Sequence, residues 1–165
     1  MSWESEKRWS DKFIPIIKPI LGTNFIVESS IEEDRDHNTD LHILNMGAIR
    51  FGCRIRRYTW YANYKNEFTI RAILPSGQKT ELEKILEGWG DYIFYGFANE
   101  NDTDLIYWFI GDLKVFRLWF LRQLSSNSKK RERKNNSDNS SKFFAFNKNE
   151  LPKDFIFAES EIILS

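Results

Sequence analysis

Apolar residues recur every four positions near the N-terminus and every second position further along, and the two spacings predict different elements. Trp9, Phe13 and Ile17 share one face of an amphipathic helix. Pro15 lies within that pattern, so we expect the helix to kink or end near it. A short apolar run over residues 24–27 predicts a strand, whereas the acidic residues after it show no periodicity and predict a loop.

Two alternating segments follow, at residues 39–44 and 48–57. A period of two is typical of a strand with one buried face. The apolar face of the second segment consists of Ile49, Phe51, Cys53 and Ile55. We expect this face in the core and Arg54 and Arg56 on the other side. Because residues 45–47 have the composition of a turn, we expect the two segments to pair as a hairpin.

The rest of the chain alternates between strand and helix signals. Thr80 and Glu83 have the spacing of a helix capping box, and Gly88 is suited to end that helix. The remaining predicted elements are strands at 67–74, 92–97, 105–110 and 143–146, a helix after Asp112, a low-complexity loop at about 125–142 and an extended tail through Ile163. This order predicts an α/β (α+β) fold with a mixed central sheet flanked by helices.

Composition narrows the class of protein. A chain of 165 residues that is 41% hydrophobic suits a single domain with a buried core. The lone Cys53 excludes an intramolecular disulfide and a zinc site of paired thiolates, which favours a reducing compartment. No apolar run approaches the roughly 20 residues of a membrane span, and charged residues interrupt the N-terminus where a signal peptide is apolar. We therefore expect a cytoplasmic protein without a membrane partner.

The formal net charge is zero, but the charges are separated along the chain. Residues 28–40 hold six acids and one base, and residues 47–71 hold six bases and one acid. An acidic segment followed directly by a basic one suits a site that holds a cation beside a phosphate. Alternatively, the two segments are solvent-exposed surfaces without a joint role. A further basic run consists of Lys129, Lys130, Arg131, Arg133 and Lys134. That run either contacts phosphate or serves as a soluble linker.

The expected hairpin brings a carboxylate, Asp40, towards two bases, Arg54 and Arg56. Phosphodiester hydrolysis needs a carboxylate that holds a divalent cation and a base beside the phosphate. The relevant stretches are Thr39-Asp40-Leu41, Cys53-Arg54-Ile55-Arg56-Arg57 and the helix at Thr80. In their order and spacing they resemble the PD-(D/E)xK nuclease superfamily, with its restriction-endonuclease-like core, over about residues 3–97.

The resemblance implies an endonuclease or exonuclease that hydrolyses DNA with Mg²⁺ or Mn²⁺. Asp40 would hold the metal, and Arg54 and Arg56 would clamp the scissile phosphate. The superfamily pattern has an acid at position 54 and Lys at 56, and arginine neither binds a metal nor acts as a base. The candidates for the second carboxylate are Glu81, Asp36 and Glu67. Without one, the fold implies a nucleic-acid-binding or regulatory protein that lacks catalysis.

Other expectations concern the contacts with DNA and with protein partners. Arg57, Arg71 and the basic run from Lys129 would contact the DNA backbone, and nucleases of this class often form homodimers. Alternatively, Arg54 and Arg56 pair with Glu67 across the sheet. The aromatic connector 58–64 either stacks on bases or caps the core, and a protein-interaction module would expose an aromatic patch.

A second resemblance concerns four short stretches of the chain. They are Thr39-Asp40-Leu41, Cys53-Arg54-Ile55-Arg56-Arg57, Glu67-Phe68-Thr69-Ile70-Arg71 and Thr80-Glu81-Leu82-Glu83-Lys84-Ile85. These stretches are similar to a family of small uncharacterised proteins from phages and bacteria. The similarity implies a phage or mobile-element setting, and for a phage protein the host cytoplasm.

Overall fold

The structure, a computed structural model, describes residues 3–28, 41–43, 49–73, 77, 79–125, 134–135 and 142–160. The chain forms two compact units, Met1–Ile49 and Arg50–Ser165. No helix in these described ranges combines the length and the apolar character that crossing a membrane requires.

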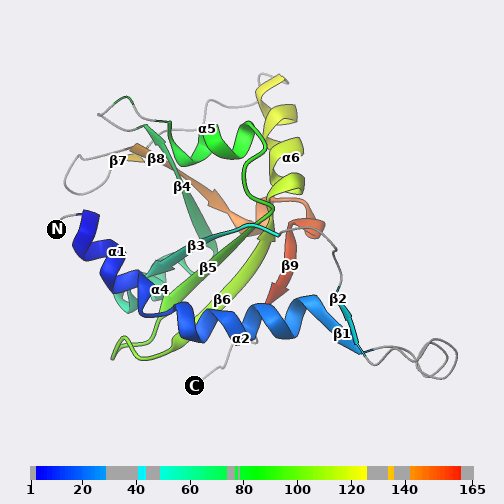
Figure 1. The fold of residues 1–165 in the computed structure, drawn as a ribbon. Helices are drawn as coiled ribbons and strands as arrows, with labels where there is room; N and C mark the ends of the chain where they lie inside the picture. Colours follow the sequence, from blue (N-terminus) through cyan, green and yellow to red (C-terminus); the bar gives the residue numbers. More distant parts are fainter. Residues whose placement is uncertain are drawn as a thin grey trace, which may run out of the picture. The chain divides into compact units, whose positions relative to one another are not determined.

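The first unit contains two helices and a short antiparallel strand pair (Figure 1). Its elements are α1 (Trp3–Asp11), α2 (Ile14–Phe25), β1 (Ile26–Glu28) and β2 (Leu41–Ile43). The helix break precedes Pro15, as predicted, because proline is well accommodated in a first helical turn. The second helix runs through Pro19 to Phe25, further than the sequence indicated.

The second unit is built on two sheets. The four-stranded sheet has the order β3-β5-β6-β9, with β3 (Phe51–Arg56), β5 (Tyr92–Ala98), β6 (Leu105–Asp112) and β9 (Ile156–Glu159). It is mixed, because β3 runs parallel to β5 whereas the other pairs are antiparallel. The antiparallel three-stranded sheet has the order β4-β8-β7, with β4 (Glu67–Ile73), β8 (Lys142–Asn147) and β7 (Lys134–Asn135).

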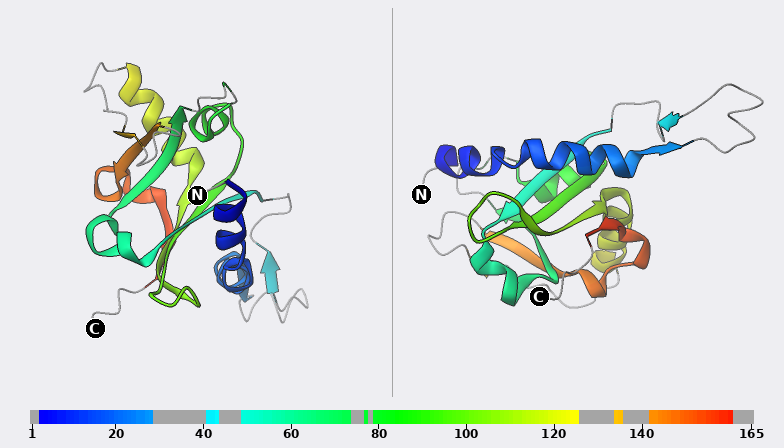
Figure 2. Two further views of the ribbon diagram at one scale, coloured as in Figure 1. Left: turned by 90° about the vertical axis from the view of Figure 1, so that its left-hand side faces the viewer. Right: turned by 90° about the horizontal axis from the view of Figure 1, so that it is seen from below.

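Helices and short turns complete the second unit. They are η1 (Tyr58–Trp60), α4 (Tyr61–Tyr64), α5 (Glu81–Leu86), α6 (Leu113–Ser125), η2 (Lys148–Glu150) and η3 (Lys153–Phe155). α5 packs on β4, and α6 packs on β5 and β6, so the two helices lie together at one end of the sheets (Figures 1 and 2). The predicted α+β class with a mixed sheet and helices is therefore confirmed.

The core of the second unit is rich in aromatic rings and draws on both sheets and both longer helices. Phe68 on β4 is fully buried, and its ring lies 5.2–6.2 Å from five other rings. Those rings belong to Tyr95, Phe109, Phe116, Phe146 and Phe155. The contacts join the three-stranded sheet to the four-stranded one.

The predicted hairpin is wrong. The strand at 41–43 pairs with β1 in the first unit, and β3 pairs with β5 in the second. A parallel partner requires a long crossover, here the segment through β4 and α5, and alternation within a strand carries no information about such a distant partner. Asp40 lies outside the described residues, as does Asp36.

α5 begins with the predicted capping box. The Thr80 hydroxyl accepts from the Glu83 backbone N–H at 3.2 Å, and a Glu83 carboxylate oxygen accepts from the Thr80 N–H at 2.7 Å. The Thr80 hydroxyl also donates to the Glu83 carboxylate at 3.0 Å, and the hydrogen bonds that the Thr80 N–H and this hydroxyl donate lower the pKa of the Glu83 carboxyl. A carboxyl whose pKa is lower in the folded than in the unfolded state stabilises the fold at a pH above its unfolded-state pKa. The stability that Glu83 contributes is therefore lost as the pH falls through its folded-state pKa.

Thr80→Ala is expected to lower the free energy of unfolding by about 1 kcal/mol, because one end of α5 loses its cap. Urea unfolding at neutral pH would measure the change. Thr59→Ala, the same substitution at an exposed position of η1, serves as a control that leaves α5 and its cap intact. An unchanged midpoint for Thr80→Ala would contradict the importance of the capping box.

Candidate functional site

The arginines of β3 lie on the inner face of their strand. In the register of β3 with β5, Arg54 is opposite Tyr95 and Arg56 is opposite Phe97, and both aromatic residues belong to the core. On the other face Cys53 is exposed, although Phe51 and Ile55 there are half-buried, so the prediction of a buried Cys53 and of arginines directed away from the core is wrong. Long arginine stems pack on apolar surface while the guanidinium groups reach polar or aromatic partners, which explains why two charged residues can occupy this face.

Beside β3 the second unit contains a cavity of about 480 Å³ whose lining is strongly basic. Its charged lining residues are Arg50, Arg54, Arg71, Lys79, Lys84 and Glu81. They come from β3, β4, α5 and the segments next to them. Buried Ile93 and Leu113 supply part of the apolar lining. Five basic residues thus line this cavity together with one acidic residue, Glu81.

Arg54 and Glu81 form the central ion pair of this lining. Arg54 Nη2 lies 2.6 Å from Glu81 Oε2, and Arg54 Nη1 donates to both oxygens of Thr69 at 3.0 Å. The backbone N–H of Arg71 donates to the same Glu81 oxygen at 3.1 Å. The acidic partner of Arg54 is therefore Glu81 on α5, and the alternative pairing with Glu67 is wrong for Arg54.

The other bases of the cavity differ in how far they are neutralised. Arg50 Nε lies 3.4 Å from Asp91, and Lys79 Nζ lies 2.6 Å from Glu87. For the Arg71 and Lys84 side chains, the described part of the chain offers no ion-pair partner. Their uncompensated charges give the cavity a positive potential that attracts anions.

Arg56 does not share the cavity with Arg54. Its guanidinium lies 5.3–5.8 Å from the ring centroids of Trp60, Tyr64 and Phe97, within the range of cation–π attraction. Its Nη1 is buried, without a hydrogen-bond partner among the described residues. The expectation that Arg54 and Arg56 clamp one phosphate together therefore finds no support in this arrangement, since the two guanidinium groups have separate surroundings.

The remaining predicted residues are distributed as follows. Arg71 lines the cavity, whereas Arg57 precedes η1 and does not line it. In the aromatic connector, Tyr61 packs 5.6 Å from Phe97 and so caps the core. Lys134 begins β7, and the rest of the basic run (Lys129, Lys130, Arg131 and Arg133) lies outside the described residues.

The described lining suits an anion better than a divalent cation. Glu81 is its single carboxylate, and the guanidinium of Arg54, 2.6 Å away, opposes a second positive charge at that position. Within the described ranges no three His, Cys, Asp or Glu residues gather closely enough to hold a metal ion. The predicted metal ligands Asp40 and Asp36 lie beyond those ranges.

A second polar cluster does not line the cavity, and its three residues, Tyr107, Lys148 and Glu159, bind one another. The hydroxyl of Tyr107 on β6 donates to Glu159 on β9 at 2.6 Å, and Lys148 lies 2.7 Å from the same carboxylate. Burial, together with the hydrogen bond to Glu159, raises the pKa of the Tyr107 phenol far above its ordinary value. The phenol therefore stays protonated, and the cluster connects β6 and η2 to β9.

Sequence reasoning missed Arg50, Lys79, Lys84 and Trp89 as cavity residues. One local signal was available, since Glu81 and Lys84 are three apart and lie on one face of a helix. The other side chains join the cavity only because α5 packs on β4. Comparison with known proteins gives no relative, since no family model, no curated protein and no solved structure matches the chain.

Proposed function

We propose that this protein binds nucleic acid and that the basic cavity of its second unit holds the phosphates. The observation that carries the proposal is that five basic residues and one acidic residue, Glu81, make up the charged part of the cavity's described lining. Arg71 and Lys84, whose charges are uncompensated among the described residues, are the main phosphate contacts. Arg54 is held in place by Glu81 and Thr69 and provides a third, pre-oriented cation.

A polyanion fits this arrangement better than a small acid does. The bases come from β3, β4, α5 and the segments next to them and line a space of about 480 Å³, which can take a nucleotide-sized group. Binding to the phosphate backbone depends on such spread cations, because each contact releases a condensed counterion. The proposal therefore predicts affinity with a pronounced dependence on salt.

The described residues favour binding over hydrolysis. Cleavage with Mg²⁺ or Mn²⁺ needs acidic ligands in addition to Glu81, whose Oε2 already accepts from Arg54 and Arg71. Membership of the PD-(D/E)xK superfamily, with its restriction-endonuclease-like core and a metal at Asp40, stays a prediction from the sequence. The phage setting, the cytoplasmic location and the homodimer are also predictions.

Binding can be tested by fluorescence anisotropy with labelled single-stranded and duplex DNA over a series of salt concentrations. Two phosphate contacts predict that the logarithm of the affinity falls with the logarithm of the salt concentration with a slope of about 1.5 or more. An affinity that does not change with salt, or no binding at low salt, would refute the proposal. The same samples incubated with Mg²⁺ or Mn²⁺ would reveal any cleavage.

Glu81→Gln is expected to tighten DNA binding about 3- to 10-fold at low salt. The amide keeps an oxygen that can accept from Arg54 and from the Arg71 N–H, but it carries no charge. One charge at close range contributes about 1 kcal/mol in water, which sets the size of the effect. Glu100→Gln, which makes the same charge change in the exposed turn before β6, is the matched control.

The measurements on Glu81→Gln also distinguish a protein that only binds DNA from one that cleaves it. Weaker binding by Glu81→Gln would contradict the role given to the Arg54 charge. If wild-type protein cleaves DNA with Mg²⁺ and Glu81→Gln does not, Glu81 acts as a metal ligand and hydrolysis becomes the better account.

A further inference from the structure

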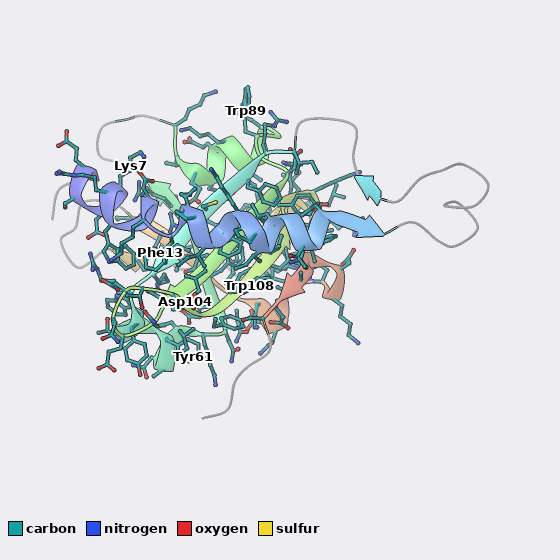
Figure 3. The ribbon with its side chains drawn as sticks, turned by 60° about the horizontal axis from the view of Figure 1, so that its bottom comes forward. Lys7, Phe13, Tyr61, Trp89, Asp104 and Trp108 are labelled. Carbon is teal, nitrogen blue, oxygen red and sulfur yellow. The ribbon has the colours of Figure 1, made fainter. Side chains whose placement is uncertain are left out.

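Trp89 is the most unusual residue in the lining of the basic cavity. Its side chain is 60% exposed, although tryptophan contributes most to stability when it is buried. It lies in the segment between α5 and β5, and its side chain projects outward there (Figure 3). Such an exposed indole beside uncompensated positive charge is the combination found where proteins hold unpaired bases.

The backbone of Trp89 is held in place by its neighbours. Gly88 and Gly90 have φ angles of +97° and +77°, a left-handed conformation that favours glycine. The Trp89 N–H donates to the Lys84 carbonyl at 3.0 Å, and the Gly88 N–H donates to that of Ile85 at 3.1 Å. These hydrogen bonds end α5 in the manner of a glycine C-cap. The exposure of the indole is therefore a consequence of a defined backbone conformation.

Arg50 contacts the indole and connects it to the charged lining. The Arg50 guanidinium carbon lies 5.5 Å from the Trp89 ring centroid, which allows cation–π attraction. Asp91 orients this arginine by accepting from its backbone N–H at 2.8 Å and from its Nε at 3.4 Å. With 60% of the side chain exposed, the indole keeps surface on which a further flat group can stack.

We infer that the cavity takes an unpaired nucleotide, with its base stacked on Trp89 and its phosphate between Arg71 and Lys84. This inference rests on the proposed function and names the class of nucleic acid. Bases inside a duplex are stacked on both sides by their neighbours, so only an unpaired or terminal nucleotide can offer its face to an indole. The ligand chemistry is a nucleoside phosphate, either within a single strand or free.

The test compares binding of a single-stranded oligonucleotide with that of a covalently closed circular duplex, which has neither unpaired nor terminal bases, for wild type and for Trp89 variants. Trp89→Ala should weaken binding of the single strand about 5- to 100-fold, the usual effect of losing one stacked base. It should leave the salt dependence and the binding of the circular duplex unchanged, because no phosphate contact is removed. Trp89→Tyr should restore most of the affinity.

The matched control is Trp60→Ala, because Trp60 is also exposed, at 44%, but does not line the cavity. Its binding should equal that of wild type. A second measurement needs no variant: a strand of abasic sites should bind wild type as weakly as the normal strand binds Trp89→Ala. Competition by a free mononucleotide would identify the free nucleotide as the ligand, and its failure to compete would identify the strand.

The two proposals fail in different ways. If wild type binds no nucleic acid, the proposed function fails and this inference fails with it. If wild type binds with the expected salt dependence but does not prefer normal strands to abasic ones, the cavity binds phosphates without a stacked base. Equal single-strand binding by wild type and folded Trp89→Ala would likewise overturn the inference alone.

Discussion

Alanine in place of Phe68 is expected to lower the free energy of unfolding by about 3–5 kcal/mol. The Phe68 ring is fully buried and contacts rings from both sheets, from α6 and from η3. Its removal leaves a cavity between elements that are packed from several sides, so neighbouring side chains can fill the space only partly. Among the described residues, few single substitutions remove as many aromatic contacts.

Urea unfolding followed by circular dichroism would measure this loss. Phe157→Ala on β9 is the control, because that side chain is 41% exposed and its removal should cost less than about 1 kcal/mol. If the two variants unfold at the same urea concentration, the packing of the three-stranded sheet on the four-stranded one is not as described.

The elements that sequence reasoning predicted correctly are those with a local cause. Thr80 and Glu83 satisfy each other's backbone groups within one turn, and Gly88 adopts the positive φ angle that ends α5. Two predicted strands, 92–97 and 105–110, correspond to β5 and β6, whose long apolar runs suit strands at the centre of a sheet. In each case the residues that determine the element lie within it.

The errors concern which strand β3 pairs with and which of its faces is buried, and both depend on distant parts of the chain. Alternation in β3 identified two faces, but the more polar one points inward because Thr69 and Glu81 lie there to accept from Arg54. A ring cluster around Trp60 similarly accommodates Arg56. Neither environment can be inferred from β3 alone, since it forms only when β4, α4 and α5 assemble.

The same reason explains how much of the candidate site was foreseen. Arg54, Arg71 and Glu81 were identified individually, as bases on strands and an acid in a first helical turn. That they meet around one cavity follows from the packing of α5 on β4, and this packing also brings in Lys84. Trp89 has the least informative sequence signal, since a tryptophan between two glycines is as compatible with a buried turn as with an exposed platform.

Reversing the two uncompensated charges, in Arg71→Glu/Lys84→Glu, should weaken DNA binding about 100- to 1,000-fold at low salt. Each substitution replaces an attraction to phosphate of about 1 kcal/mol by a repulsion of similar size, and a tenfold change corresponds to about 1.4 kcal/mol. Fluorescence anisotropy with single-stranded DNA would measure the loss. The dependence on salt should also become weaker, because fewer counterions are released.

The matched control for net charge is Arg122→Glu/Lys153→Glu, which reverses two exposed bases that do not line the cavity. At about 0.1 M salt, where both double variants are compared, it should bind within about threefold of wild type, because the Debye length is then about 10 Å and exposed charges beyond it are largely screened. Arg71→Gln/Lys84→Gln removes the charges without adding repulsion, so it should lose about half the free energy lost by the reversal. Equal losses for the reversal and for the Arg122/Lys153 control would show that overall charge, and not this cavity, governs binding.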